Sequence, residues 1–426
     1  MAAIWQSFIH KTNNNLVTIM NNTAHSTLPT ANKLLTHKPR HEMIDALRGF
    51  ALLGICLVHC MEYFELYWVK QDPTALHNLI FFLFAGKAYA IFALMFGVSF
   101  FIIMDNQARK GVDFRYRFVW RLVILLALGY VHTLLYLGDI LSVLGVIGLS
   151  LLFVQRLSNR WLIALATLCL LQFPFYYQYY AALNHLPGAN DNPAFFSLFG
   201  DVYAAIQGAS LSELFALNSA QGIYAKWMFF VESGRGLQLI GLFIIGLVLG
   251  RIGFFTQPEK FERSRVTALG IALLASAVLY WLDKSVQQLP ATTFQESAMA
   301  KWYITQALGT YLSSAITASL VLLFIQCYYW RPTGRYLNLL APCGQISLTI
   351  YLLQSVIGVP LFYPFGLGWY ETIGQTNSLL FGIVFYAVLM CMAQAWVKRF
   401  YYGPVEWLWR SATYMTTAVP LIKRAY

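Results

Sequence analysis

The chain has 426 residues, of which 58% are hydrophobic and 11% are charged. Soluble domains carry about 25% charged residues, so this composition excludes an ordinary soluble enzyme and indicates a membrane protein. The net charge of +11 does not predict nucleic-acid binding, because the basic residues lie in short loops between apolar runs, where they act as topology signals. The six cysteines are scattered without metal-ligand spacing, so we expect no zinc site and no other metal.

The chain begins with a polar, mildly basic segment, residues 1–39, which we expect to be a disordered cytoplasmic extension. Apolar segments dominate the rest. A helix that spans a membrane needs about 20 apolar residues, and ten segments approach or exceed that length. They are residues 46–66, 77–103, 118–137, 139–155, 160–181, 227–250, 265–283, 303–329, 344–362 and 378–400. The sequence therefore predicts an all-α, polytopic membrane domain over residues 40–400.

Arginine and lysine gather in alternate loops, as the positive-inside rule requires. With the N-terminus in the cytoplasm, every loop obeys the rule and both termini are cytoplasmic. The longest predicted outer loop, residues 182–226, is too polar to span and is expected to form short helices on the outer membrane face. The tail, residues 401–426, mixes Trp and Tyr with basic residues, which is typical of an interfacial helix on the inner surface.

Ionisable side chains lie inside or at the edge of the first four apolar segments. They are His59, Lys87, His132 and Asp139. A charged residue at that depth costs roughly 2.5–3.5 kcal/mol on insertion scales, so such residues are rarely accidental. In the first segment, Arg48 and His59 share a helix face, and eleven residues separate them, or about 16 Å along the axis. Lys87 lies at middle depth in the second segment.

The third segment carries a similar stripe, which ends in a tight turn. Arg121, His132 and Asp139 lie on the same face. His132 and Asp139 are seven residues apart, or about 10 Å along a straight helix, so we expect no direct hydrogen bond between them. Asp139 is expected instead to orient a histidine on a neighbouring helix or to cap the turn.

Each of these residues also has a purely structural interpretation. A single intramembrane histidine often forms a hydrogen bond between helices, and Lys87 could be the counter-charge of Glu62 or Asp139. Together, however, the four ionisable residues share one depth in consecutive segments. Their placement therefore favours a polar cavity.

Such a cavity suits proton transfer at a hydroxyl group. Histidine titrates near pH 6.5 and can take the proton of a hydroxyl group as that group attacks an activated carbonyl carbon. His59 or His132 would be the general base, with Asp139 and Lys87 as orienting or oxyanion-stabilising groups. The chain has no Gly-x-Ser-x-Gly motif, so direct transfer is favoured over a covalent acyl-enzyme.

Basic residues at the predicted inner mouth complete this hypothesis. Arg40, Arg48 and Arg121 gather there, and arginine binds phosphate groups through paired hydrogen bonds. These three residues could therefore hold the phosphates of a cytosolic acyl-CoA co-substrate.

Five ordered motifs also give the chain a resemblance to a known family. They are Arg40-His-Glu-Met-Ile-Asp45-Ala-Leu-Arg48-Gly49, Gly86-Lys87 followed by Phe96-Gly97, Gly129-Tyr-Val-His132 with Gly138-Asp139-Ile-Leu141, Leu348-Thr349-Ile-Tyr351-Leu-Leu-Gln354-Ser355, and Gly403-Pro404-Val-Glu406-Trp407. Over residues 40–410 the chain resembles the YeiB-like family of bacterial inner-membrane proteins. Through that family it resembles the transmembrane acyltransferase superfamily.

The resemblance implies a multi-pass protein of the bacterial inner membrane. It would move an acyl group, with acetyl favoured, from cytosolic acyl-CoA to a hydroxyl group of a cell-envelope glycan or lipid. In the superfamily the first span carries a histidine at the position of His59, whereas many YeiB-like relatives hold asparagine there. His132 lies in the family's own Gly-x-x-His motif, so the identity of the base is open between two histidines.

Two other classes of function fit the same residues. Aligned His, Lys and Asp side chains also suit a proton-coupled transporter or exporter, although the sequence shows no inverted repeats. A non-catalytic assembly or sensor protein is the third class. The oligomeric state stays open.

Overall fold

The computed structural model describes residues 42–423 of the chain. About 80% of the structure is helical, and no strand is present in the described range; an isolated antiparallel bridge joins Phe400 to Ile422. The predicted all-α class is therefore confirmed. The expected extension, residues 1–39, and the predicted donor residue Arg40 lie outside the described residues.

The helices of the first half of the chain lead from the first apolar segment to the predicted outer loop. They are α2 (Glu42–Met61), η2 (Tyr63–Trp68), α3 (Ala75–Phe84), α4 (Lys87–Ala108), α5 (Arg115–Leu135), α6 (Leu141–Ile147), α7 (Leu149–Val154), α8 (Asn159–Leu170), α9 (Phe173–Leu183), α10 (Ala194–Ile206), α11 (Leu211–Leu217), the π-helical η3 (Asn218–Gly222) and α12 (Ile223–Glu232).

The second half contains the longest helices. They are α13 (Arg235–Ile252), η4 (Glu259–Phe261), α14 (Glu262–Gln288), η5 (Ala291–Phe294), α15 (Ala298–Tyr329), α16 (Arg331–Leu337), η6 (Asn338–Leu340), α17 (Ala341–Gln345), α18 (Ser347–Phe362), η7 (Trp369–Glu371), α19 (Gly374–Arg399) and α20 (Pro404–Tyr414).

Eight helical segments of the described chain are long and apolar enough to cross a membrane. A ninth candidate is a bent pair, Arg331–Gln345 with Ser347–Phe362, which turns by 80°. Each of these segments overlaps one of the ten predicted spans. The remaining predicted span, 139–155, is a shorter apolar stretch, Leu141–Val154, which falls below the length that crosses a membrane. The protein is thus a multi-pass membrane protein, and the cytoplasmic location of its termini stays a prediction.

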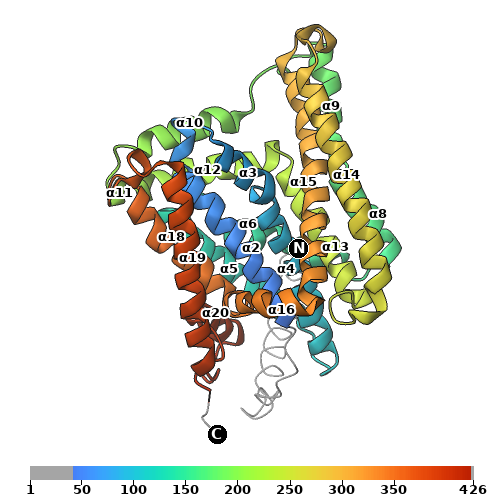
Figure 1. Ribbon diagram of the computed structural model, residues 1–426, viewed down its shortest axis with the longest axis vertical. Helices are drawn as coiled ribbons and strands as arrows, with labels where there is room; N and C mark the ends of the chain where they lie inside the picture. Colours follow the sequence, from blue (N-terminus) through green and yellow to red (C-terminus); the bar gives the residue numbers. More distant parts are fainter. Residues whose placement is uncertain (1–41, 424–426) are drawn as a thin grey trace, which may run out of the picture. The chain divides into compact units, whose positions relative to one another are not determined.

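Helix α2 is enclosed by the other helices. Of its most apolar window, 78% is buried inside the protein, against 11% for α14. It contacts α4, α17, α18 and α19, and the blue ribbon of α2 runs through the middle of the helices in Figure 1. Among its polar residues, Asp45 is therefore buried, and Arg48 and His59 are partly buried.

A close crossing of two helices explains Gly97, a glycine of the five sequence motifs. At the crossing of α4 and α13, a Cβ atom on Gly97 would lie 2.1 Å from the Phe243 carbonyl oxygen, and one on Gly246 would lie 2.1 Å from the Leu94 carbonyl oxygen. The two backbones therefore touch, as small residues allow in membrane helix pairs.

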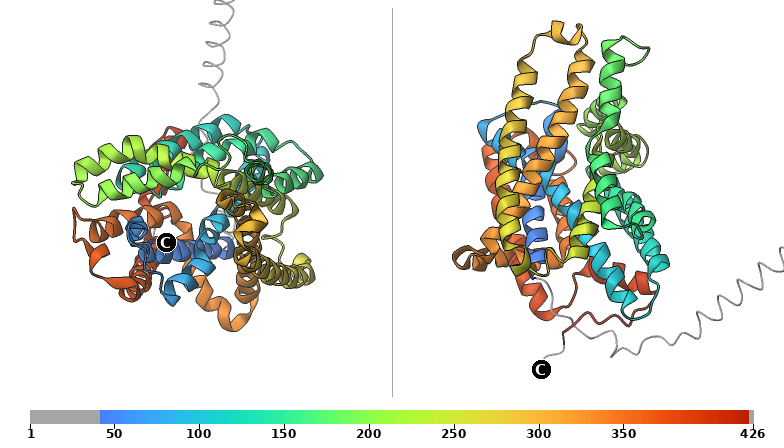
Figure 2. Two further views of the ribbon diagram at one scale, coloured as in Figure 1. Left: turned by 90° about the horizontal axis from the view of Figure 1, so that it is seen from above. Right: turned by 90° about the vertical axis from the view of Figure 1, so that its right-hand side faces the viewer.

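Shorter helices lie at the two ends of the long ones. Helices α10 and α11 are at one end in Figure 1, and α16 and α20 are at the other. Helices α9, α14 and α15 run side by side in Figures 1 and 2. The loop 182–226 and the tail 401–426 do contain short helices, as predicted; their contact with the two membrane surfaces stays a prediction.

Candidate active site

A sharp reversal of the chain after α5 builds the candidate site. Helix α5 ends at Leu135, and Tyr136 is extended, with φ −136° and ψ 112°. The chain then turns back, and α6 packs along α5. A Cβ atom on Gly129 would lie 2.3 Å from the Ser142 backbone nitrogen. The glycine of the Gly-x-x-His motif is therefore needed for this close approach.

The reversal brings His132 and Asp139 into direct contact. His132 Nδ1 lies 2.9 Å from Asp139 Oδ1, and both side chains are buried. The expectation that these two residues do not form a hydrogen bond is therefore wrong. It assumed a straight helix through both positions, whereas the helix ends before Tyr136 and the turn folds Asp139 back.

Asp139 also caps the start of α6 from the position before the N-cap residue Ile140, as one of the sequence alternatives predicted. Its oxygens accept hydrogen bonds from the backbone nitrogens of Leu141 (3.1 Å) and Ser142 (3.0 Å), and from Ser142 Oγ (2.7 Å). A carboxylate at a helix N-terminus satisfies orphan N–H groups and interacts favourably with the helix dipole. The carboxylate is therefore fixed by several donors at once and cannot turn away from His132.

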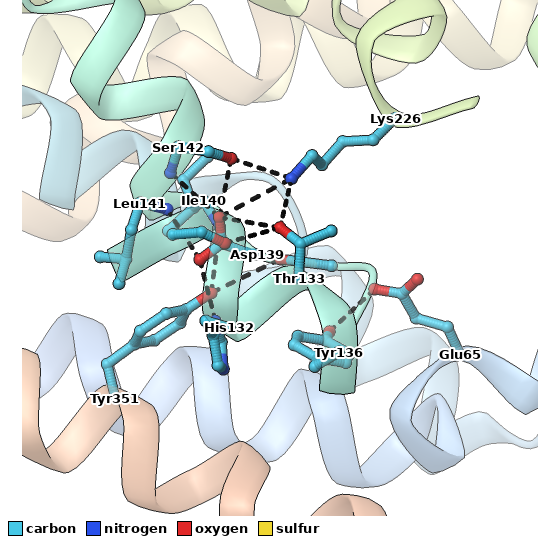
Figure 3. Close-up of polar contacts among 12 residues, drawn as sticks. Glu65, His132, Thr133, Tyr136, Asp139, Ile140, Leu141, Ser142, Lys226 and Tyr351 are labelled. Atoms are coloured by element: carbon cyan, nitrogen blue, oxygen red, sulfur yellow. Dashed lines mark hydrogen bonds and ion pairs between the residues drawn. The ribbon is translucent and has the colours of Figure 1, made fainter. Parts of the chain in front are cut away.

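A lysine that sequence reasoning missed completes the cluster. Lys226 of α12 is 3% exposed; its Nζ donates to Thr133 Oγ1 (2.7 Å) and Ser142 Oγ (2.8 Å) and lies 3.7 Å from Asp139 Oδ2. Figure 3 shows the lysine reaching down onto Thr133, Asp139 and Ser142. It is the only Lys or Arg in residues 182–226. Its place directly before the predicted span 227–250 was the signal that could have found it, because an ionisable residue at a membrane boundary is a candidate functional residue.

Lys87, the lysine singled out from sequence, lies elsewhere. Its Nζ donates to the Phe81 carbonyl oxygen (3.2 Å) and lies 5.9 Å from the centre of the Phe82 ring. These contacts hold the lysine at the break between α3 and α4. The lysine that neighbours Asp139 is thus Lys226, and a catalytic role for Lys87 stays a prediction.

Helix α18 supports the turn from the opposite side. The Tyr351 hydroxyl group accepts the backbone N–H of Ile140 (3.1 Å) and lies 3.5 Å from the Gly138 carbonyl oxygen. The first turn of α18 is itself held by Glu406 of α20, whose Oε1 accepts the backbone N–H groups of Leu348 (2.6 Å) and Thr349 (3.0 Å). The two C-terminal motifs therefore meet, and they position a tyrosine at the site.

The hydrogen bond to Asp139 assigns the protons of His132. An ionised carboxylate only accepts, so Nδ1 donates in this contact. In the neutral tautomer that this requires, Nε2 is the nitrogen that can accept a proton. Nε2 is buried and has no hydrogen-bond partner among the described residues. It lies on the side of the ring that points away from Asp139 in Figure 3. This is the arrangement of a general base whose orientation is set by a carboxylate.

His59 lies beside the same aromatic ring as His132. The Tyr136 ring centre is 5.1 Å from that of His59 and 5.9 Å from that of His132. Nδ1 of His59 is buried and, within the described part of the chain, has no hydrogen-bond partner. The structure thus brings both candidate histidines to one tyrosine.

Glu65 is a second residue that sequence reasoning missed. Tyr136 donates its hydroxyl hydrogen to Glu65 Oε1 (2.8 Å), and Tyr203 of α10 donates to Oε2. Tyr63, Phe64 and Glu65 all have positive φ (51°, 52° and 86°), which is costly for residues other than glycine. No local sequence pattern indicated this conformation, because three successive non-glycine residues rarely adopt it.

Two of the predicted donor arginines, Arg48 and Arg121, lie near each other and contact groups other than the two histidines. Arg48 NH1 pairs with Asp45 Oδ1 (3.1 Å), and NH2 donates to Ser99 Oγ. The Arg121 guanidinium stacks on the Trp409 ring, 3.6 Å from the ring centre. It is close enough to Arg48 and Arg410 for their positive charges to repel it. The structure thus groups basic side chains from α2, α5 and α20. Residues 42–423 contain no group of three or more His, Cys, Asp or Glu side chains placed to hold a metal ion.

Two protein-family models match consecutive parts of the chain. Residues 40–252 match a family model described as heparan-alpha-glucosaminide N-acetyltransferase, catalytic. Residues 249–416 match one described as protein of unknown function (DUF418). The first match contains His59, His132, Asp139 and Lys226, and the second contains Tyr351 and Glu406. The chain therefore has a membrane acyltransferase-like fold.

Three bacterial proteins resemble the chain over 88–90% of its length. The chain is 25% identical to YxaH of Bacillus subtilis over 88% of its own length and 94% of that protein. It is 27% identical to YeiB of Escherichia coli over 90% of its length and 99% of that protein. A 39.9 kDa protein encoded in the amylase 3′ region of Bacillus acidopullulyticus is 26% identical, over 89% and 96%. The chain belongs to the YeiB-like family, as the sequence motifs predicted.

Proposed function

We propose that the protein transfers an acyl group, with acetyl favoured, from cytosolic acyl-CoA to a hydroxyl group of a cell-envelope glycan or lipid, and that His132 is the general base. The observation that carries the proposal is the buried His132–Asp139 pair, which leaves Nε2 without a hydrogen-bond partner in the described chain. The match of residues 40–252 to an acetyltransferase catalytic region supports the class of reaction.

The proposed step is a direct transfer. Nε2 of His132 takes the proton of the acceptor hydroxyl group while the hydroxyl oxygen bonds to the thioester carbonyl carbon. The carbon–sulfur bond then breaks, and the imidazolium returns its proton to the departing thiolate. Asp139 keeps the ring in the reactive tautomer and stabilises the imidazolium by its charge.

In this mechanism Lys226, and not Lys87, is the lysine that orients Asp139. Because it is charged and lies 3.7 Å from Asp139 Oδ2, it favours the ionised form of that carboxyl group. The same lysine restrains Thr133 and Ser142. His59, across the Tyr136 ring, is proposed to line the acceptor side, and Arg48 and Arg121 to contact the donor phosphates.

Turnover of acetyl-CoA by purified protein in proteoliposomes tests the proposal. Release of free CoA thiol is measured for the unmodified protein and for the variants His132→Ala and His59→Ala. We expect loss of turnover in His132→Ala and a smaller loss in His59→Ala. If both variants retain full turnover, the proposed mechanism is wrong. Solute counterflow without a covalent product would instead support the transporter class, which buried His, Lys and Asp side chains also suit.

A further inference from the structure

Two helix breaks meet at a site remote in sequence from His132. Helices α8 and α9 are interrupted at Gln172, which has φ 55°, and α12 and α13 at Gly234, which has φ 70°. A Cβ atom on Gly234 would lie 2.1 Å from Gln172 Oε1, so the two breaks are in contact. Interrupted helices that face one another line ligand sites in many membrane proteins, because they expose backbone groups and make room between helices.

A cavity of about 400 Å³ lies at these breaks, which is enough for a small organic molecule. Gln172 and Phe175 are buried at its wall, whereas Asp191 and Val231 are exposed. The cavity therefore has a buried interior and an open rim. Its lining comes from α9, the segment before α10, the α12–α13 break and α15, and it includes none of the residues of the candidate active site.

Three aromatic side chains form one part of the lining. The ring centres of Phe175 and Trp302 are 6.1 Å apart, those of Phe175 and Tyr303 are 6.4 Å apart, and those of Trp302 and Tyr303 are 5.1 Å apart. The Phe175 and Trp302 planes are perpendicular, at 90°. Aromatic rings that meet at an angle can present more than one π face to a ligand, and such faces attract cations.

Two carboxylates give the same cavity a negative charge. Glu232 and Asp191 both line it, and no Lys or Arg side chain does. Glu232 is held in place because its Oε2 accepts the backbone N–H of Phe195 (3.0 Å). Both carboxylates act electrostatically on the Tyr303 hydroxyl group. The negative groups therefore lie next to the aromatic rings rather than on a separate surface.

We propose that the cavity between the Gln172 and Gly234 helix breaks binds an ammonium-bearing ligand, held by the Phe175, Trp302 and Tyr303 rings and by the Glu232 and Asp191 carboxylates. An anionic ligand is disfavoured by two carboxylates without a lining cation. A neutral apolar ligand would displace water from both carboxylates without replacing the lost hydrogen bonds, and this desolvation costs free energy. The ammonium group is a substituent of a membrane lipid or of a free solute. The proposal does not depend on acyl transfer at His132.

Paired probes of equal shape test the proposal. Choline and its uncharged isostere 3,3-dimethylbutan-1-ol are titrated into the full-length protein in phosphatidylglycerol nanodiscs, with heat of binding as the readout. Because the attraction to the rings and the carboxylates acts only on the charged probe, we expect choline to bind more than about tenfold more tightly than the isostere. Equal binding of the two probes would overturn the proposal.

Variants connect the binding to the lining residues. The double variant Glu232→Gln with Asp191→Asn removes both charges while Gln can still accept the Phe195 N–H. We expect it to weaken choline binding at least about tenfold. The matched control is Asp201→Asn, an exposed carboxylate of α10 that does not line the cavity; binding as tight in the double variant as in this control would refute the proposal. A second variant, Trp302→Leu, is expected to weaken choline binding as well.

A change of lipid distinguishes the two sources of the ammonium group. Nanodiscs of phosphatidylethanolamine supply it on a headgroup, and nanodiscs of phosphatidylglycerol do not. If the lipid is the ligand, phosphatidylethanolamine competes with choline and weakens its apparent affinity. If the ligand is a free solute, choline binds equally in both. Because every readout is binding, the result is independent of the acyl-transfer assay.

Discussion

Replacing Asp139 by Asn removes one negative charge and leaves the shape of the side chain unchanged. In the protein, the Asp139 oxygens accept hydrogen bonds from His132 Nδ1, from Ser142 Oγ and from two backbone N–H groups, and Lys226 lies 3.7 Å away. The amide can accept at one oxygen only. Asp139→Asn therefore leaves His132 without its orienting carboxylate and Lys226 without a buried counter-charge.

The stability cost follows from the stranded lysine. Lys226 is 3% exposed, and removing one partner of a buried ion pair costs about 3–5 kcal/mol, because the other charge stays uncompensated. The two Lys226 hydrogen bonds to Thr133 and Ser142 place the expected loss at the lower end, about 3 kcal/mol. Adding Lys226→Met removes the stranded charge, so the double variant is expected to regain about 2 kcal/mol.

The loss of catalytic rate in Asp139→Asn has a different origin, and the added Lys226→Met substitution is not expected to restore it. Loss of a positioned general base lowers rates by about 10²–10⁴-fold, and Asp139→Asn is expected to reach that range because Nδ1 loses its acceptor. CoA thiol release gives the rate, and equilibrium unfolding in mixed micelles gives the stability. The matched control is Asp283→Asn in α14, a buried carboxylate that accepts from Gln287 Nε2 (2.8 Å). If Asp139→Asn retains more than half of the control's rate, the reasoning is refuted.

Three further substitutions test other parts of the structure. Gly129→Ala puts a methyl group 2.3 Å from the Ser142 backbone nitrogen and should cost about 2 kcal/mol or more in unfolding free energy, whereas Gly200→Ala, with open space around its Cβ, should cost nothing measurable. Arg48→Ala should raise the KM for acetyl-CoA about tenfold with kcat less affected; an unchanged KM would remove Arg48 from the donor site. Gly403→Ala puts a methyl group 2.2 Å from Glu406 Oε2; we expect a lower melting temperature and slower turnover, and an unaltered melting temperature would show that the α18–α20 contact is not needed.

The helical class and the family could be predicted from sequence because their signals are local. Apolar runs of membrane-spanning length identify the helices, and the five motifs lie in uninterrupted stretches of chain. The motif residues His132, Asp139 and Tyr351 do meet in the structure. Glu406 holds the start of the helix that carries Tyr351. What the sequence analysis got wrong was the distance between His132 and Asp139, since seven residues were placed on one straight helix.

The missed residues act over long sequence separations. Lys226 is 93 residues from Thr133 and 84 from Ser142, so no periodicity connects them. Glu65 reaches Tyr136 and Tyr203 only because residues 63–65 leave the right-handed helical conformation. The residue types at these three positions do not predict that conformation. In contrast, Lys87 satisfies its charged end on a nearby carbonyl oxygen, which is the structural interpretation that its position in sequence also allowed.

The central claim is that His132 Nε2 takes the acceptor proton. The most direct measurement is the single-turnover rate of acyl transfer from acetyl-CoA in His132→Ala, compared with His77→Ala. His77 is an equally buried histidine of α3, and its ring stacks on those of Tyr67 and Phe81. We predict a rate at least about 10²-fold lower in His132→Ala and a rate close to that of the unmodified protein in His77→Ala. Equal rates in the two variants would contradict the claim.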